Sequence, residues 1–199
     1  MLWIDEPVTL RGRAIDLLPL DRTHFPVLEN IASDKRIWEF MSFPCDNAGA
    51  FQKQYDLALE ERDKGIQYPF VIYHKKDQRI IGATRYLEMV PAHRKLEIGW
   101  TWLNPQYWAS DVNPECKLLL LTHCFEKLHT SRVTLRTSEF NIRSRKAIGK
   151  IGASFEGIIR NDIITANQTK RNSAWFSIIE EEWPAVKQQL TAFHRSRSQ

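Results

Sequence analysis

Residues 96–160 hold the part of the chain whose residue types and order could support chemistry. This segment reads as strand, loop, helix, strand, helix and strand, with a short loop at the carboxyl end of the first strand. Asn113 predicts the N-cap and Pro114 the first residue of the helix that follows and runs to Leu128. Backbone N–H groups and the positive end of the helix dipole converge at such a start. The order therefore predicts an anion-binding site in the loop at residues 108–113.

The elements around this segment are predicted to form an α/β sheet with mixed strand directions and helices on both faces. Strands are expected at 8–18, 68–74, 79–89, 95–103, 132–137, 155–159 and 173–179, with turns at 76–78 and 161–172. Helices are expected at 21–32, 47–62, 113–128, 141–150 and 180–190, with Asn47 as one N-cap and Gly65 as one stop. We expect a single domain over residues 1–190 and a mobile basic tail over 191–199.

The composition of the 199 residues, 43% apolar and 26% charged, is typical of a soluble globular protein with a substantial core. A net charge of +4 suits a small anionic ligand or an acidic partner, and it is too diffuse to favour nucleic acid. The charged first twenty residues predict no signal peptide, and the run Leu118–Leu121 is too short to span a membrane. The cysteines lack Cys-x-x-Cys spacing and the histidines lack metal-ligand spacing. We therefore expect a cytoplasmic protein with reduced thiols, no metal and no membrane partner.

Several short motifs, spread over nearly the whole chain, match the pattern of one known family. They are Leu10-Arg-Gly-Arg with Leu18-Pro-Leu-Asp, Glu97-Ile-Gly-Trp with Trp102-Leu-Asn-Pro and Tyr107-Trp, Asn141-x-x-Ser144 with Ile151-Gly-Ala, Glu156-Gly, and Ser177-Ile-Ile with Glu182-Trp. The chain thereby resembles the GNAT superfamily of acetyl-CoA-dependent N-acetyltransferases. More narrowly, it resembles the branch of the RimJ and RimL ribosomal-protein N-terminal acetyltransferases.

The resemblance implies a mostly antiparallel sheet of about seven strands, splayed between the fourth and fifth, with helices on both faces. It implies acetyl-CoA as co-substrate and a primary amine, on a protein N-terminus or a small molecule, as acceptor; a homodimer stays open. Pantetheine would bond to the backbone between the splayed strands, and the pyrophosphate would sit at the following helix start. The implied coenzyme-binding residues are Trp102, Leu103, Asn104, Trp108, Ala109, Ser110, Asp111, Val112, Asn113, Asn141, Ser144, Arg145 and Lys146.

The chain departs from the family pattern in the pyrophosphate loop. Where the family has Gln or Arg, then Gly, then Gly or Ala, this chain has Trp108, Asp111 and Asn113. Glycine permits positive φ and close approach to phosphates, whereas the charge of Asp111 would repel them. The alternative function is therefore a degenerate GNAT-fold protein with weak or no coenzyme binding and a regulatory role.

Glu97 is implied as the general base, acting through a water, because the matched strand position often carries the catalytic carboxylate of the family. The alternative is a structural carboxylate paired with Arg94 or Lys95. Ser144 is implied as a hydrogen-bond partner of the coenzyme sulfur, because the tyrosine acid of many relatives is Ile148 here; its alternative role is in the first helical turn. An α-amine with a pKa of ~7.7–8 and a thiol with a pKa of ~8.5 need only weak acid and base assistance.

Several other candidate residues have both a functional and a purely structural interpretation. Asn141 is expected either to cap its helix and contact the coenzyme or to cap alone. The basic residues Arg143, Arg145, Lys146 and Lys150 either meet the coenzyme phosphates or form a solvated face. His93 is a second candidate base. The aromatic residues Trp100, Trp102, Tyr107 and Trp108 line a ligand slot or belong to the core.

Overall fold

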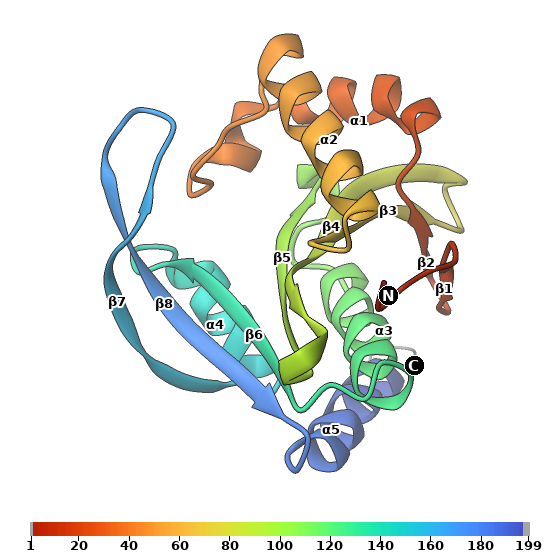
Figure 1. The fold of residues 1–199 in the computed structure, drawn as a ribbon. Helices are drawn as coiled ribbons and strands as arrows, with labels where there is room; N and C mark the ends of the chain where they lie inside the picture. Colours follow the sequence, from red (N-terminus) through yellow and green to blue (C-terminus); the bar gives the residue numbers. More distant parts are fainter. Residues whose placement is uncertain (1, 197–199) are drawn as a thin grey trace.

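The computed structural model describes the backbone of residues 2–196 and the side chains of residues 2–192. Its centre is one twisted eight-stranded sheet in the order β1-β2-β3-β4-β5-β6-β8-β7 (Figure 1). All neighbouring strands pair antiparallel except β5 and β6, which pair parallel. The strands are β1 Leu10–Arg11, β2 Ile15–Pro19, β3 Tyr68–His74, β4 Arg79–Val90, β5 Lys95–Leu103, β6 Arg132–Ser138, β7 Ser154–Ile164 and β8 Lys170–Ile179. The predicted mixed α/β fold is confirmed.

Helices cover both faces of the sheet. The helices α1 Phe25–Ala32 and α2 Ala48–Asp63 lie on one face, over a core that includes Phe51, Tyr55 and Trp102. The helices α3 Val112–Glu126, α4 Ile142–Lys150 and α5 Trp183–Ser196 lie on the other face, over a second core (Figure 1). Burial of apolar side chains on both faces stabilises the sheet and fixes the direction in which each strand presents its residues.

The sheet splays between β5 and β6, the fourth and fifth of the predicted strands. These two strands pair only over Lys95–Glu97 with Arg132–Thr134, and each then continues without the other. On its other edge β5 stays paired with β4 as far as Leu103. The register of this pair shifts between Ala83 and Arg85, and Trp100 has a positive φ of 50°, which together mark a β-bulge. The bulge and the parting of the strands leave one edge of β5 open from residue 98 onward.

Several local predictions are confirmed. The Asn47 side chain accepts a hydrogen bond from the N–H of Ala50 at the start of α2, and Gly65 follows that helix with φ 72°. The Asp21 side chain caps the short 3₁₀ turn before α1. These signals depend only on neighbouring residues, so the sequence carries them directly.

Other predicted boundaries are wrong because tertiary contacts extend or divide the elements. The single strand expected at 8–18 is split into β1 and β2, and the turn between them is held by Glu115 of α3, which accepts from the N–H groups of Arg13 and Ala14. The last two strands are longer than expected, which shortens the polar turn to 165–169. The last helix passes position 190 and ends at Ser196, so the tail boundary at 191 falls inside α5; residues 197–199 lie outside the described residues.

Among the residues that the structure describes, no helix is both long and apolar enough to cross a membrane. The thiols of Cys45, Cys116 and Cys124 are free and buried. In the same part of the chain, His, Cys, Asp and Glu side chains form no group that could hold a metal ion.

Candidate active site

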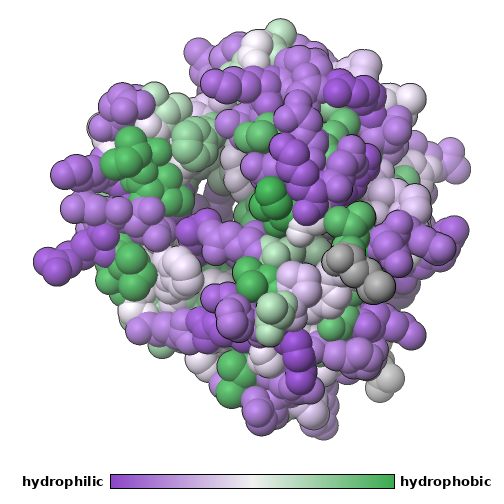
Figure 2. Space-filling model, viewed as in Figure 1, coloured by the Kyte–Doolittle hydropathy of each residue, from purple (hydrophilic) through white to green (hydrophobic). Residues whose placement is uncertain are grey.

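A cavity of about 650 Å³ lies where β5 and β6 part. Its walls are the open part of β5, the loop at 107–110, the first turns of α3, the end of β6 and one side of α4. Ile37, Phe40 and Met41, in the segment between α1 and α2, close its far end. The space-filling view shows a narrow opening between the β7–β8 hairpin and the layer of α1 and α2 (Figure 2). The cavity therefore joins the expected coenzyme loop to the face of the sheet that carries α1 and α2.

The charged residues that line the cavity are all cationic. No Asp or Glu belongs to its lining among the described residues. A set of cations confined to one concave surface raises the local concentration of anions and favours ligands with phosphate groups. The lining cations are Lys117, Arg136, Arg143, Lys146, Lys150 and Arg171.

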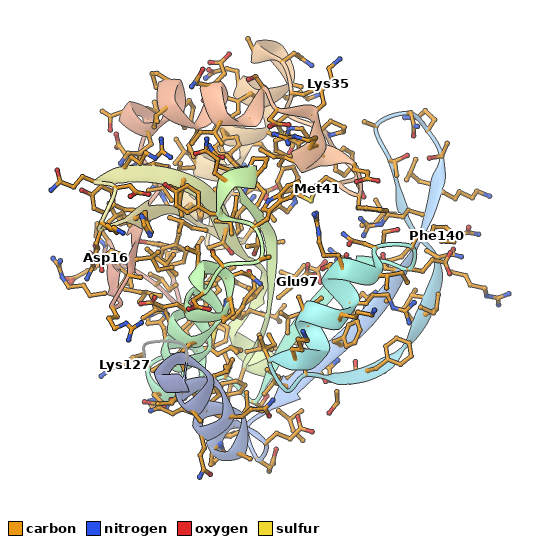
Figure 3. All side chains as sticks on the ribbon, turned by 180° about the vertical axis from the view of Figure 1, so that it is seen from behind. Asp16, Lys35, Met41, Glu97, Lys127 and Phe140 are labelled. Atoms are coloured by element: carbon orange, nitrogen blue, oxygen red, sulfur yellow. The ribbon has the colours of Figure 1, made fainter. Side chains whose placement is uncertain are left out.

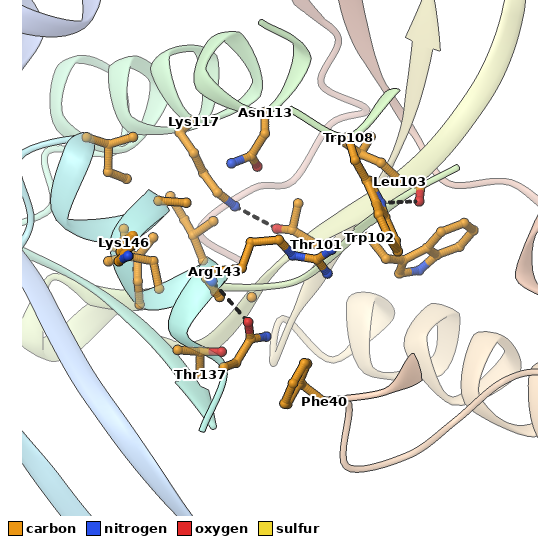
Figure 4. Close-up of a pocket in the computed structure, with 18 of the residues that line it drawn as sticks. Phe40, Thr101, Trp102, Leu103, Trp108, Asn113, Lys117, Thr137, Arg143 and Lys146 are labelled. Atoms are coloured by element: carbon orange, nitrogen blue, oxygen red, sulfur yellow. Dashed lines mark hydrogen bonds between the residues drawn. The ribbon is translucent and has the colours of Figure 1, made fainter. Parts of the chain in front are cut away.

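Arg143 extends from the first turn of α4 across the cavity. Its guanidinium lies over the Trp108 ring, 4.2 Å from the ring centroid (Figure 4). Trp108 is itself held in place because its indole N–H donates to the carbonyl of Leu103, 3.1 Å away. A cation–π contact at such an exposed site is worth only about 0.5–1 kcal/mol, so Arg143 can exchange the ring for a phosphate at small cost.

The loop before α3 forms without glycine. Its left-handed residue is Ala109, with φ 57°, whereas Asp111 has φ −77° and needs no glycine. The hydroxyl of Ser110 accepts from the N–H of Val112 at 3.3 Å and donates to the carbonyl of Tyr107 at 2.6 Å. Asn113 lies inside α3, so the predicted N-cap at Asn113 is wrong and the helix begins at Val112. The backbone strain expected at Asp111 is therefore absent.

The variant Asp111→Gly is expected to bind acetyl-CoA within about twofold of the wild type. Asp111 does not line the cavity and has a helical backbone, so glycine there neither opens the site nor relieves strain. Calorimetric titration of both proteins with acetyl-CoA checks this result. A tenfold gain in affinity, equal to about 1.4 kcal/mol, would show instead that the carboxylate repels the phosphates.

The predicted coenzyme-binding residues divide into two groups. Those that line the cavity are Trp102, Leu103, Trp108, Ala109, Ser110, Asn113, Asn141, Ser144 and Lys146. Asn104, Asp111, Val112 and Arg145 are not part of the lining. The N–H of Asn104 already donates to Ile81 at 2.7 Å within the sheet. Arg145 is directed elsewhere, since its guanidinium donates to the carbonyl of Glu139 at 3.1 Å and lies over the Phe155 ring.

Asn141 and Ser144 form the cap of α4. The Asn141 side chain accepts from the N–H of Ser144 at 3.0 Å, which confirms the predicted N-cap, and both residues line the cavity. Arg143, Lys146, Ala147 and Lys150 follow along the cavity side of the same helix, at helical spacing. Arg143, Lys146 and Lys150 line the cavity and are also exposed to solvent, so contact with coenzyme phosphates and a solvated basic face both stay predictions.

Glu97 lies at the narrow end of the splay and is only 3% exposed (Figure 3). Its carboxylate is 2.9 Å from Nε of Arg136 on β6, and Arg136 also contacts Glu88 at 2.8 Å and Asp162 at 3.6 Å. The predicted alternative partner Arg94 instead pairs with Glu180, so that pairing is wrong. Burial raises the pKa of Glu97 to about 7 against the opposing attraction of Arg136. A carboxyl group with this pKa changes its protonation state near neutral pH, as a general base must.

Lys117 is one of three lining cations, with Arg136 and Arg171, that the sequence analysis did not single out. It belongs to α3, is 6% exposed, and its ammonium donates to the Thr101 hydroxyl at 2.6 Å across the cavity (Figure 4). A signal was present, because Lys117 opens an otherwise apolar run of the helix. His93, the second candidate base, lies exposed in the turn before β5 and does not line the cavity.

The splayed central sheet holds a cleft between its parting strands, and the cationic lining of this cleft suits a ligand with phosphate groups. Residues 15–154 match the family model of the acetyltransferase (GNAT) domain. The chain therefore belongs to the GNAT family of acetyltransferases.

Relatives agree with this assignment. The chain is 26% identical over 111 residues to YdaF of Bacillus subtilis (strain 168), whose name assigns it to the ribosomal N-acetyltransferases. This match covers 56% of the chain and spans 60% of YdaF. A crystal structure of an assigned acetyltransferase from T. thermophilus has a TM-score of 0.83 at 30% identity, covering 94% of this chain and 97% of that one. Mycobacterium smegmatis RimJ in complex with CoA-disulfide shares the fold, with a TM-score of 0.79 at 21% identity and 98% of each chain covered.

Proposed function

We propose that this protein transfers the acetyl group of acetyl-CoA to a primary amine, on a protein N-terminus or a small molecule. The observation that carries the proposal is the cavity between β5 and β6, whose charged lining is entirely cationic. The open edge of β5 suits an extended pantetheine chain, which would lie against it like an added strand. The phosphates would meet Arg143, Lys146 and Lys150 of α4 and the first turn of α3.

The acceptor would enter at the other end of the cavity. Ile37, Phe40 and Met41 form an apolar wall there, and Trp100 faces the same space from β5. The N–H of Ala166, at the tip of the β7–β8 hairpin, donates to the carbonyl of Ser42 at 2.9 Å and closes this entrance on one side. Such a narrow entrance suits the end of a polypeptide chain or a small amine. An amine on a folded protein surface could not reach the interior of the cavity through it.

Glu97 would serve as the base for the attacking amine. An α-amine has a pKa of ~7.7–8, so much of it is protonated at neutral pH and must lose a proton before or during attack. Glu97, with a pKa of about 7, can accept this proton. Because Glu97 does not itself line the cavity among the described residues, the proton would pass through a bridging water.

Thermal unfolding with acetyl-CoA, and with CoA and ATP as controls, tests the proposal. A ligand at ~100 times its Kd adds ~2.7 kcal/mol of stability, which for a chain of this length is a rise of roughly 5–10 °C. We expect this rise with both CoA species and a smaller one with ATP. The variant Arg143→Ala should need about fivefold more coenzyme for the same rise, because one charge-assisted hydrogen bond of about 1 kcal/mol is lost.

The exposed Lys127→Met is the matched control, since Lys127 follows α3 at its far end and lies outside the cavity lining (Figure 3). It should respond to acetyl-CoA like the wild type. No rise at millimolar acetyl-CoA would contradict the proposal and favour a GNAT-fold protein with a regulatory role.

A further inference from the structure

Lys117 is a buried cation in the middle of the cavity. Its side chain runs from α3 to the Thr101 hydroxyl, which in turn is 2.8 Å from the hydroxyl of Thr84 on β4. Among the described residues no carboxylate lies within ion-pair distance of Lys117. Burial of a charge without an opposite charge is costly, so such a residue is rarely kept for packing alone.

The electrostatic surroundings of Lys117 favour an easily transferred proton. Burial lowers the pKa of Lys117, whereas Cys116 and Glu97 oppose this shift. Glu97 therefore acts on Lys117 through space, although the two come from different elements. Two titratable groups whose pKa values are displaced toward neutrality from opposite sides are typical of an acid and a base that work together.

Lys117 lies close to the point where β5 and β6 part, and there it would be beside the thiol end of a bound pantetheine chain. The strands β5 and β6 are last paired at Glu97 and Thr134, and Thr101 lies four residues further along β5, ~13 Å in an extended strand. The phosphates belong at the outer end, near Trp108 and α4, so the thioester must lie toward the narrow end. Between these two ends, Lys117 is the lining cation whose ammonium is bonded to β5, at the Thr101 hydroxyl.

We propose that Lys117 is the catalytic acid that stabilises the leaving thiolate of CoA, an assignment that rests on the proposed acetyl transfer. The amine nitrogen bonds to the carbonyl carbon of the thioester, the carbon–sulfur bond breaks, and its electron pair goes to sulfur. Nζ of Lys117 then gives one proton to the sulfur, while Glu97 takes one from the attacking nitrogen through water. Solvent returns a proton to Lys117 and removes one from Glu97. Ile148 stands where many relatives have a tyrosine acid, and its side chain cannot donate a proton. Another side chain must therefore protonate the sulfur.

The ionisation of the bound CoA thiol tests this assignment without an acceptor amine. A cation within 4–6 Å lowers the pKa of an acidic group by about 1–3 units. We expect the ultraviolet absorbance of the thiolate, in protein saturated with CoA, to titrate at least about one unit lower than in free CoA. The thiols of the protein itself do not interfere, because burial raises the pKa of Cys45 to about 12 and of Cys116 to about 11 and raises that of Cys124 further.

The variant Lys117→Met should bind CoA, since methionine fills the same space, and its bound thiol should titrate like free CoA. Lys117→Arg, which keeps the charge, should restore most of the shift, and Lys127→Met should behave like the wild type. Intact mass spectrometry after incubation with acetyl-CoA should show no acetyl group on Lys117, because in this assignment Lys117 donates a proton and does not attack the thioester.

The outcomes separate this assignment from the proposed function. Equal thiol pKa values in the wild type and Lys117→Met, with CoA bound to both, would overturn the role of Lys117 and leave acetyl transfer standing. An acetyl group found on Lys117 would overturn it as well, because the residue would then be a nucleophile. Failure of the wild type to bind CoA would overturn the proposed function and this assignment together.

Discussion

Glu97→Gln is expected to gain stability relative to the wild type as the pH rises from 4.5 to 7, by up to about 3 kcal/mol. The pKa of Glu97 is about 7 in the folded protein against an ordinary value of 4.5, so the folded state holds a proton that the unfolded state has already lost. In this window the folded state binds more protons, and the stability of the wild type falls as the pH rises. Glutamine has no proton to lose and is free of this dependence.

Urea unfolding at several pH values between 4 and 9 measures this difference. The matched control is Glu180→Gln, a glutamate whose side chain is 52% exposed on the surface, and it should follow the wild type closely. A stability difference between Glu97→Gln and the wild type that stays constant over this range would show that Glu97 ionises at its ordinary pH despite its burial. Above about pH 8, where Glu97 is ionised in both states, the difference should become constant.

Glu115→Ala is expected to lower stability by about 3 kcal/mol, or the melting temperature by roughly 6–12 °C. Glu115 of α3 is 5% exposed, and its carboxylate accepts from the backbone N–H groups of Arg13 and Ala14, the latter at 3.0 Å. Alanine removes this charge-assisted acceptor from the turn between β1 and β2, and cannot replace the contact between α3 and the sheet edge. Differential scanning calorimetry gives the change directly.

The conservative variant Glu115→Gln keeps an acceptor at the same place and should lose less than half as much. The exposed Lys127→Met, at the end of the same helix, is the control for a side-chain change on α3 away from this contact. If Glu115→Ala melted within about 2 °C of the wild type, the turn would have to be held by its own residues rather than by α3.

The parts of the fold that could be predicted from the sequence are those with local causes. Asn47 and Asn141 cap their helices as expected because a cap needs only the next three residues. The start of α3 was not placed correctly because Asn113 followed by Pro114 is the stronger local signal for a helix start. The helix begins at Val112, and its N-cap Asp111 makes no side-chain capping hydrogen bond that the sequence could announce.

The parts of the site that could not be predicted depend on which elements come together. The partner of Glu97 is Arg136, on a strand that follows an entire helix, and near neighbours such as Arg94 offered equally reasonable pairings. The position of the Lys117 ammonium in the cleft depends on its hydrogen bond to Thr101, a residue sixteen positions earlier on another element. The family resemblance predicted a cleft between the two splayed strands. Which charged side chains line this cleft depends on how α3 and α4 pack beside it, and only the structure shows that packing.

The short pairing of β5 with β6 has a consequence for how the protein opens. Among the described residues, only the pairs formed by Lys95–Glu97 and Arg132–Thr134 connect the strand ladder of β1–β5 with that of β6–β8. We therefore expect the two parts to open as separate cooperative units, although a shared core under α3 and α5 joins them on one face. Amide hydrogen exchange should report them as separate units, with β6, β7 and β8 opening at lower free energy than β3 and β4. A ligand bound between β5 and β6 would bridge the two units as an added strand. In its presence, hydrogen exchange should show one common opening free energy for both units.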